Sequence, residues 1–165
     1  MPLISIGLLA LFKAIPRIDP LRKNIEKFRN YFDWFNALIL LFLLYIHLLV
    51  IAWNLGYKFD FIALMAPALG ALFYFTGVML KHAKRNWFIG LRTPWTLSSD
   101  KVWDKTHAKA GKLFKLAGII ALFGAVFKEY ALYLLLVPVI AFSAYLMIYS
   151  WLEFKKATVN RKARK

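Results

Sequence analysis

Long runs of hydrophobic residues without charged side chains follow one another along the chain. The clearest runs are residues 34–57, 61–80 and 130–152, each with Trp, Tyr or Phe near its ends. A helix needs about 20 mostly apolar residues to cross the hydrocarbon core of a bilayer, and aromatic rings favour the membrane interface. The pattern therefore predicts three transmembrane helices over these ranges.

Two shorter hydrophobic runs are interpreted as further crossings. Residues 1–15 reach a spanning length only when Lys13 is included, and residues 113–127 contain Lys115. A lysine near a helix end can extend its ammonium group to the interface, so both segments are still expected to cross the membrane. A charged two-residue turn separates the second run from the next one, which predicts a tight helical hairpin.

Basic residues are concentrated in three polar segments. Residues 13–33, 81–115 and 153–165 hold 21 of the 23 Lys and Arg residues, which together give the chain a net charge of +15. The positive-inside rule makes these segments cytoplasmic, so we predict five crossings of the cell membrane, an external N-terminus and a cytoplasmic C-terminus. Because this topology accounts for most of the charge, we expect anionic lipid as a partner and no direct nucleic-acid binding.

The composition predicts an all-α, multi-pass transmembrane helical bundle in which residues 1–165 form a single membrane domain. Hydrophobic residues make up 61% of the chain and charged residues 19%, which is more apolar material than a soluble core of this length can bury. The chain has no cysteine, and no Asp or Glu falls within a predicted span. We therefore expect no catalytic residues, no metal and no cofactor, and interpret the protein as a non-enzyme.

A polar segment ahead of the first long span predicts an amphipathic helix at the membrane interface. Asp19 followed by Pro20 is typical of a helix start, because aspartate caps a helix and proline has the φ angle of its first residue. Apolar residues then recur at helical spacing, at Leu21, Ile25, Phe28 and Phe32. The opposite face is basic, as in helices that lie at the headgroup boundary.

The cytoplasmic segment 81–112 mixes aromatic and basic side chains, which is unusual for a solvent-exposed loop. Gly90 permits a tight turn, and Pro94 forces the residue before it toward extended geometry. The Ser-Ser-Asp sequence at 98–100 is typical of a helix N-terminus. We predict an ordered turn that leads into a helix continuous with the 113–127 span.

This segment resembles the signature of a known family. Residues 81–98, Lys-His-Ala-Lys-Arg-Asn-Trp-Phe-Ile-Gly-Leu-Arg-Thr-Pro-Trp-Thr-Leu-Ser, and residues 102–107, Val-Trp-Asp-Lys-Thr-His, are similar to the SdpI family of multi-pass bacterial membrane proteins. Residues 18–28 resemble the family's segment before its third crossing, so the likeness covers most of residues 16–118. Members usually begin with one more transmembrane helix, and this chain opens in what resembles their second span.

The resemblance implies a toxin-immunity function. The family's type member protects cells from a secreted, membrane-active peptide, and in the presence of the toxin it draws an autorepressor to the inner membrane face, which releases the immunity operon from repression. The implied partners are therefore a secreted toxic peptide and a cytoplasmic transcriptional repressor.

Two groups of residues are candidates for the site. The candidates for cytoplasmic partner binding are Lys84, Arg85, Asn86, Trp87, Arg92, Thr93, Pro94, Trp95, Thr96, Trp103, Lys105, Thr106 and His107. The alternative for this group is interfacial anchoring or ordering of the loop. Within the membrane, His47 and Asn54 are candidates for toxin recognition, because polar groups in lipid are costly; the alternative is an interhelical hydrogen bond.

Two rival functions are also compatible with the sequence. The first is a small transporter or efflux component, which would move substrate across vesicles and depend on a gradient or on His47. The second is a purely sensory membrane anchor for a soluble regulator, which would recruit that regulator without protecting the cell.

Overall fold

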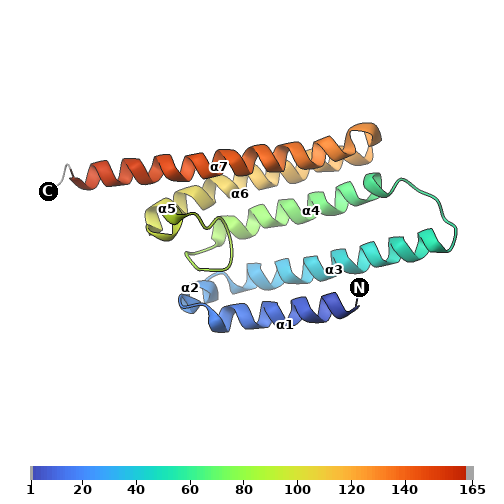
Figure 1. The fold of residues 1–165 in the computed structure, drawn as a ribbon, viewed down its shortest axis with the longest axis horizontal. Helices are drawn as coiled ribbons and strands as arrows, with labels where there is room; N and C mark the ends of the chain where they lie inside the picture. The colour runs from blue at the N-terminus through green and yellow to red at the C-terminus, as the bar shows by residue number, and fades with distance from the viewer. Residues whose placement is uncertain (1, 163–165) are drawn as a thin grey trace.

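The computed structural model describes residues 2–162, and this part of the chain is all helical. Its seven α-helices and two short 3-10 helices are α1 (Pro2–Ile18), α2 (Arg22–Glu26), α3 (Arg29–Asn54), α4 (Phe61–His82), α5 (Pro94–Leu97), α6 (Asp100–Leu122), η1 (Phe123–Ala125), η2 (Lys128–Tyr130) and α7 (Ala131–Lys162). The long helices lie along one another in an elongated bundle whose connections are at its two ends (Figure 1). The predicted all-α fold is confirmed.

Three helical segments in residues 2–162 are long and apolar enough to cross a membrane, namely Arg29–Asn54, Phe61–His82 and Lys128–Val159. They correspond to the three long charge-free runs, so those three predictions are confirmed at the level of length and composition. α1, at 17 residues, is shorter. The first half of α6 is polar, because it carries the charged residues Asp100, Lys101, Asp104 and Lys105.

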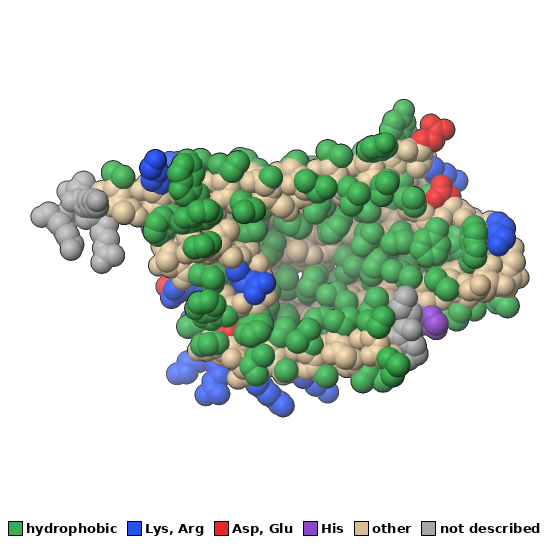
Figure 2. Space-filling model, in the orientation of Figure 1, with side chains coloured by type: hydrophobic (Ala, Val, Ile, Leu, Met, Phe, Trp, Pro, Cys, Tyr) green, Lys and Arg blue, Asp and Glu red, His purple; other side chains and the backbone are tan. Residues whose placement is uncertain are grey.

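The outer face of the bundle is largely hydrophobic. Large apolar side chains of the long helices are exposed, among them Leu41, Leu48, Val137, Ile140 and Ile148. Figure 2 shows hydrophobic side chains along the length of the bundle, while many of the visible Lys and Arg side chains lie toward the end that holds α2 and α5. Soluble monomers rarely expose so much contiguous apolar surface, so this face is suited to lipid.

Helices α4 and α6 pack in direct backbone contact through facing glycines. A Cβ atom at Gly111 would lie 2.8 Å from the carbonyl oxygen of Gly77, and one at Gly118 would lie 2.5 Å from the carbonyl oxygen of Gly70. Small residues permit this approach, which increases van der Waals contact where lipid removes the hydrophobic driving force between helices. The pair α4 and α6 therefore forms the closely packed centre of the bundle.

The predicted start of α6 is confirmed. The Ser99 hydroxyl accepts a hydrogen bond from the backbone N–H of Val102 at 3.4 Å, as an N-cap residue does. One face of α6 is buried, and it includes Val102, Trp103, Thr106 and Ala110. At the other end of α6, the two 3-10 helices turn the chain into α7, which confirms the expected tight hairpin.

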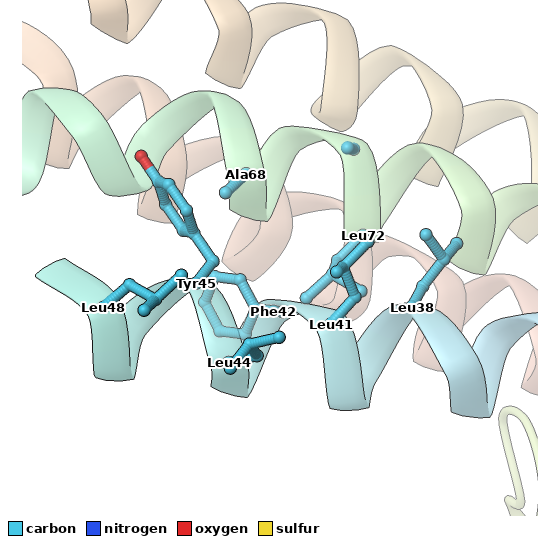
Figure 3. A pocket seen from close by; sticks show the side chains of 9 residues that line it. Leu38, Leu41, Phe42, Leu44, Tyr45, Leu48, Ala68 and Leu72 are labelled. Carbon is cyan, nitrogen blue, oxygen red and sulfur yellow. The ribbon is translucent and has the colours of Figure 1, made fainter.

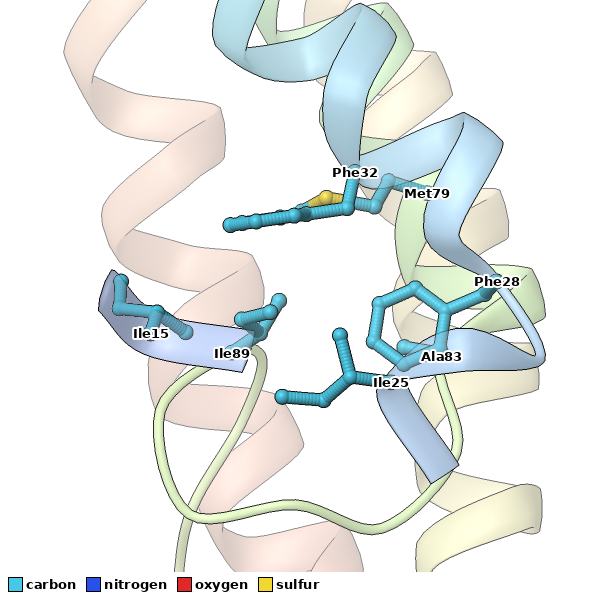
Figure 4. Packing of buried hydrophobic residues seen from close by; sticks show 7 residues of the cluster. All are labelled: Ile15, Ile25, Phe28, Phe32, Met79, Ala83 and Ile89. Atoms are coloured by element: carbon cyan, nitrogen blue, oxygen red, sulfur yellow. The ribbon is translucent and has the colours of Figure 1, made fainter. Parts of the chain in front are cut away.

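The predicted amphipathic helix before the first long span is interrupted, which corrects the sequence interpretation. α2 contains only five residues, and the chain turns at residues 27–28 before α3 begins. Ile25 on α2 and Phe28 in the turn both point into one buried cluster, where they meet Met79 and Ile89 (Figure 4).

We predict that substitution of Gly111 by valine lowers the stability of the folded chain. The added side chain would meet the backbone of α4, and overpacking of this kind costs about 1–3 kcal/mol or more. Thermal unfolding in detergent should show a lower Tm. Gly7→Ala is the matched control, because nothing lies within 4 Å of a Cβ at Gly7; an equal loss of Tm in both variants would contradict the close approach of α4 and α6.

Candidate functional site at the loop between α4 and α6

Residues 83–99, which we call the α4–α6 loop, lie between the end of α4 and the start of α6 and include the short helix α5. Its first turn is organised by Asn86, whose side chain is fully buried. The Asn86 Oδ1 atom accepts hydrogen bonds from the backbone N–H groups of Phe88, at 3.0 Å, and Ile89, at 2.6 Å. Its Nδ2 atom donates to the carbonyl oxygens of Lys84 and Ile89. One side chain thus satisfies the polar backbone of the whole turn.

Two polar side chains from the N-terminal part of the chain hold this turn in place. The Asp19 carboxylate accepts from the backbone N–H of Leu21 at 2.6 Å and from that of Trp87 at 2.9 Å. Asn24 on α2 donates to the carbonyl oxygen of Arg85 at 2.9 Å. Asp19 was interpreted as a local helix cap, and the structure adds a contact 68 residues away in sequence.

The middle of the loop rests on His107 and Trp103, two buried side chains of α6. The backbone N–H of Leu91 donates to His107 Nε2 at 3.1 Å, and His107 Nδ1 lies 3.0 Å from the carbonyl oxygen of Trp103. The Trp103 and His107 rings stack with centroids 3.9 Å apart, and Trp103 Nε1 donates to the carbonyl oxygen of Ala83. Both rings therefore hold the loop backbone against α6.

The hydrogen bonds of His107 require a neutral imidazole, because Nε2 acts as an acceptor. Burial lowers the pKa of His107 to about 4, since a charged ring would lose its hydration, while the Trp103 carbonyl acts in the opposite direction. Gly90 makes the close approach possible. Its φ angle is +103°, and a Cβ there would lie 2.5 Å from His107 Nε2, so both backbone conformation and space require glycine.

The last part of the loop is a capping box that also contacts α7. Thr93 and Thr96 bond each other's backbone N–H groups at the start of α5, where Pro94 is the first helical residue. Thr93 is extended, with ψ of 159°, as expected before a proline. The Thr93 hydroxyl also lies 3.2 Å from the hydroxyl of Ser150 on α7, so the loop reaches the last helix of the bundle.

Ion pairs surround this hydrogen-bonded framework. Arg85 Nε lies 2.7 Å from the Asp100 carboxylate, and Lys84 Nζ lies 3.2 Å from that of Asp104. Lys105 on α6 pairs with Glu153 on α7, and the carboxylate raises the pKa of the lysine. The Arg85–Asp100 and Lys84–Asp104 pairs are largely exposed, so they contribute little to stability and mainly orient the side chains, whereas the Glu153 side chain is buried.

The structure divides the predicted cytoplasmic candidates into two sets. Six are buried: Asn86, Thr93, Thr96, Trp103, Thr106 and His107. All of these except Thr106 make hydrogen bonds within the loop or to its backbone. Five are exposed, namely Lys84, Trp87, Arg92, Pro94 and Lys105. The remaining two, Arg85 and Trp95, are half-buried. Among the exposed residues, Trp87 is notable because half of this large aromatic side chain is accessible.

The two intramembrane candidates lie apart from the loop on α3. His47 is half-buried. Asn54 is exposed near the end of the helix, where its Nδ2 atom donates to the carbonyl oxygen of Val50 at 2.8 Å. The structure therefore gives Asn54 a local hydrogen bond within its own helix.

Two contacts of α7 were not foreseen from the sequence, namely those of Ser150 and Glu153. The buried polar side chain of Asn36 on α3 was not foreseen either. Ser150 and Glu153 meet loop and α6 residues 57 and 48 positions away. No local pattern marks such pairs, because a hydroxyl or carboxylate at the end of an apolar run has the appearance of an ordinary helix terminus.

Comparison with known proteins identifies the family. The profile of the SdpI/YfhL protein family matches residues 82–150, which begin at the end of α4 and cover the whole α4–α6 loop, α6 and most of α7. The chain belongs to the SdpI/YfhL family. The resemblance seen in the loop sequence is thereby confirmed.

A curated relative supports the assignment over a longer stretch. The chain is 32% identical over 127 residues to the protein named "Immunity protein SdpI" from Bacillus subtilis (strain 168), an alignment that covers 76% of this chain. The chain spans 60% of the length of that SdpI relative. No solved structure matches the chain.

We predict that acidification destabilises the fold through His107. Its folded pKa of about 4 lies below the unfolded value of ~6.5. Between these values the unfolded state binds more protons, so the stabilisation present above pH ~6.5 falls as the pH drops toward 4, by up to about 3 kcal/mol. Thermal unfolding of the purified chain across this pH range measures the loss.

His107→Gln is the matched variant, because an amide can accept the Leu91 hydrogen bond and does not titrate. Carboxylates also titrate in acid, so the informative quantity is the difference in pH dependence between the two proteins. Identical pH profiles would show that His107 does not couple protonation to folding.

Proposed function

We propose that this chain is a membrane immunity protein that protects its cell from a secreted, membrane-active peptide, and that its α4–α6 loop recruits a cytoplasmic repressor. The observation that carries the proposal is the 32% identity to Immunity protein SdpI over most of this chain. The match to the family profile, residues 82–150, includes the whole α4–α6 loop. The proposal therefore assigns the shared function to this hydrogen-bonded loop.

The proposal includes five membrane crossings, formed by α1, α3, α4, α6 continued by η1, and α7, with the N-terminus outside. Two features support it. α2, the α4–α6 loop and α5 lie at one end of the bundle, and the α3–α4 and α6–α7 connections lie at the other (Figure 1). Within residues 2–162, most of the basic residues belong to segments at the first end, as expected of the cytoplasmic side.

Within the loop, the exposed residues are the proposed contact surface for the repressor. Trp87 combines a half-exposed indole ring with a backbone N–H held by Asp19, and it is adjacent to the exposed ring of Phe88. Arg92 donates to the carbonyl oxygen of Trp87, so its position is fixed relative to that ring. A rigidly held Trp with a nearby Arg is the kind of pair that dominates binding at protein interfaces.

The intramembrane part of the proposal concerns the peptide toxin. The half-buried His47 lies within the apolar stretch of α3, where an imidazole offers a hydrogen-bonding group to a peptide in the bilayer. Toxin binding would recruit the repressor only if the peptide binds one arrangement of the loop more tightly than another.

We predict that a thiol at position 98 is accessible from the cytoplasm and one at position 58 from outside. The chain has no cysteine, so Ser98→Cys and Lys58→Cys each give a single reporter. In intact cells a membrane-impermeant maleimide should label only the second variant, with the first labelled after permeabilisation. The reverse pattern would contradict the proposed orientation.

We also predict that protection and signalling separate genetically. Expression of the native chain should rescue toxin-sensitive cells and should induce a reporter under the chain's own operon promoter. Trp87→Ala should retain rescue but reduce induction by about 10-fold, the effect of removing an aromatic anchor worth ~1–2 kcal/mol. Its side chain is exposed and its backbone hydrogen bond survives, so the fold should be unaffected.

The control is Tyr57→Ala, which removes a similarly exposed aromatic ring from the α3–α4 turn. It should change neither readout. Unchanged killing of cells that express the native chain would refute the immunity function, and normal induction by Trp87→Ala would refute the docking role of the loop.

A further inference from the structure

Two of the cavities along α3 differ in their polar groups. The first, of about 370 Å³, is lined by apolar side chains of α3 and α4 together with Tyr45 (Figure 3). The Tyr45 hydroxyl donates to the carbonyl oxygen of Leu64 at 3.1 Å, so the polar group at this cavity is already paired. Lipid chains suffice to fill such a groove.

The second cavity, of about 350 Å³, is lined by side chains of α1, α3, α4 and α6 and by residues 88–91 of the α4–α6 loop. Four of its lining side chains, Ile15, Phe32, Met79 and Ile89, converge from α1, α3, α4 and the loop in Figure 4. The volume lies within the ~300–1,000 Å³ typical of small-molecule sites. Among the lining residues that the structure describes, none is charged.

Asn36 sets this second cavity apart. Its side chain lines the cavity, the residue is only 7% exposed, and among residues 2–162 no group donates a hydrogen bond to its Oδ1 atom. A buried polar atom left unpaired costs about 1–3 kcal/mol, so such groups are rare unless a ligand or water completes them. Thr76, another polar residue of the cavity, is already bonded to the carbonyl oxygen of Leu72.

We propose that this cavity binds a neutral amphiphile, an aliphatic chain with one hydroxyl group that donates a hydrogen bond to Asn36 Oδ1. The apolar lining recognises the chain, and the lack of charged lining residues disfavours an ionised head group. The inference goes beyond the proposed immunity function and does not depend on it.

The position of the cavity gives a bound molecule direct contact with the loop. Gly90 and Leu91 line the cavity, and the backbone N–H of Leu91 is the group that bonds His107. Occupancy would therefore stabilise the observed arrangement of the loop against α6 by filling the space beneath it.

The test uses the full chain in phosphatidylcholine nanodiscs, with 15N-labelled asparagine side chains and dodecan-1-ol as the probe. Affinities are calculated from the concentration of the alcohol in the bilayer. Binding should shift the signal of the Asn36 side-chain amide and raise the Tm of the chain. Dodecane, which has the same chain and no hydroxyl, should bind about 10-fold more weakly, the loss expected for one buried hydrogen bond. Dodecanoate should also bind weakly.

Asn36→Leu supplies a second readout. Without ligand it should have a higher Tm than the native chain, because it removes an unpaired buried amide, and it should bind the alcohol no better than the alkane. Asn54→Leu is the control, since Asn54 is exposed and bonded within its own helix; it should keep the native preference. Equal binding of alcohol and alkane, an unmoved Asn36 signal, or a lower Tm for Asn36→Leu would each overturn the proposal.

Discussion

The α4–α6 loop closes one end of a hydrophobic helix bundle, and its backbone polar groups must be paired within the protein. A buried backbone N–H or C=O group is stable only where protein groups replace water as its hydrogen-bond partners. Asn86, Asp19, His107 and Thr96 each supply such partners, and each is buried. These hydrogen bonds also join the N-terminal helices, α6 and the loop, so the shape of this end of the bundle depends on them.

This requirement explains why the loop contains two kinds of residue, buried ones that pair with its backbone and exposed ones that do not. Residues that pair with the backbone have little freedom to contact a partner, because their polar atoms are already engaged. The side chains left over, chiefly Trp87 and its neighbours Phe88 and Arg92, point out of the framework that the buried set creates. A rigid scaffold that presents a few exposed aromatic and basic groups is well suited to recognition, because little entropy is lost when they bind.

The bundle itself is packed unevenly. α4 and α6 are in backbone contact at Gly77 and Gly111, whereas the buried residues of α3 that the structure describes are Phe32 and Asn36, both near its N-terminal end. α3 is therefore joined to the remaining helices mainly through the region beneath the loop, and the two cavities described above lie along it.

The sequence by itself determined the helical class, the three long apolar helices, the start of α6 within residues 98–100 and the family, because these depend on hydrophobic period, local capping and a contiguous motif. It did not predict the break between α2 and α3, nor which motif residues are buried and which exposed. Those features depend on contacts between residues far apart in the chain, such as Asp19 with Trp87 and Thr93 with Ser150. Tertiary packing alone decided them, because the spacing of residues along the sequence does not show which distant groups will come into contact.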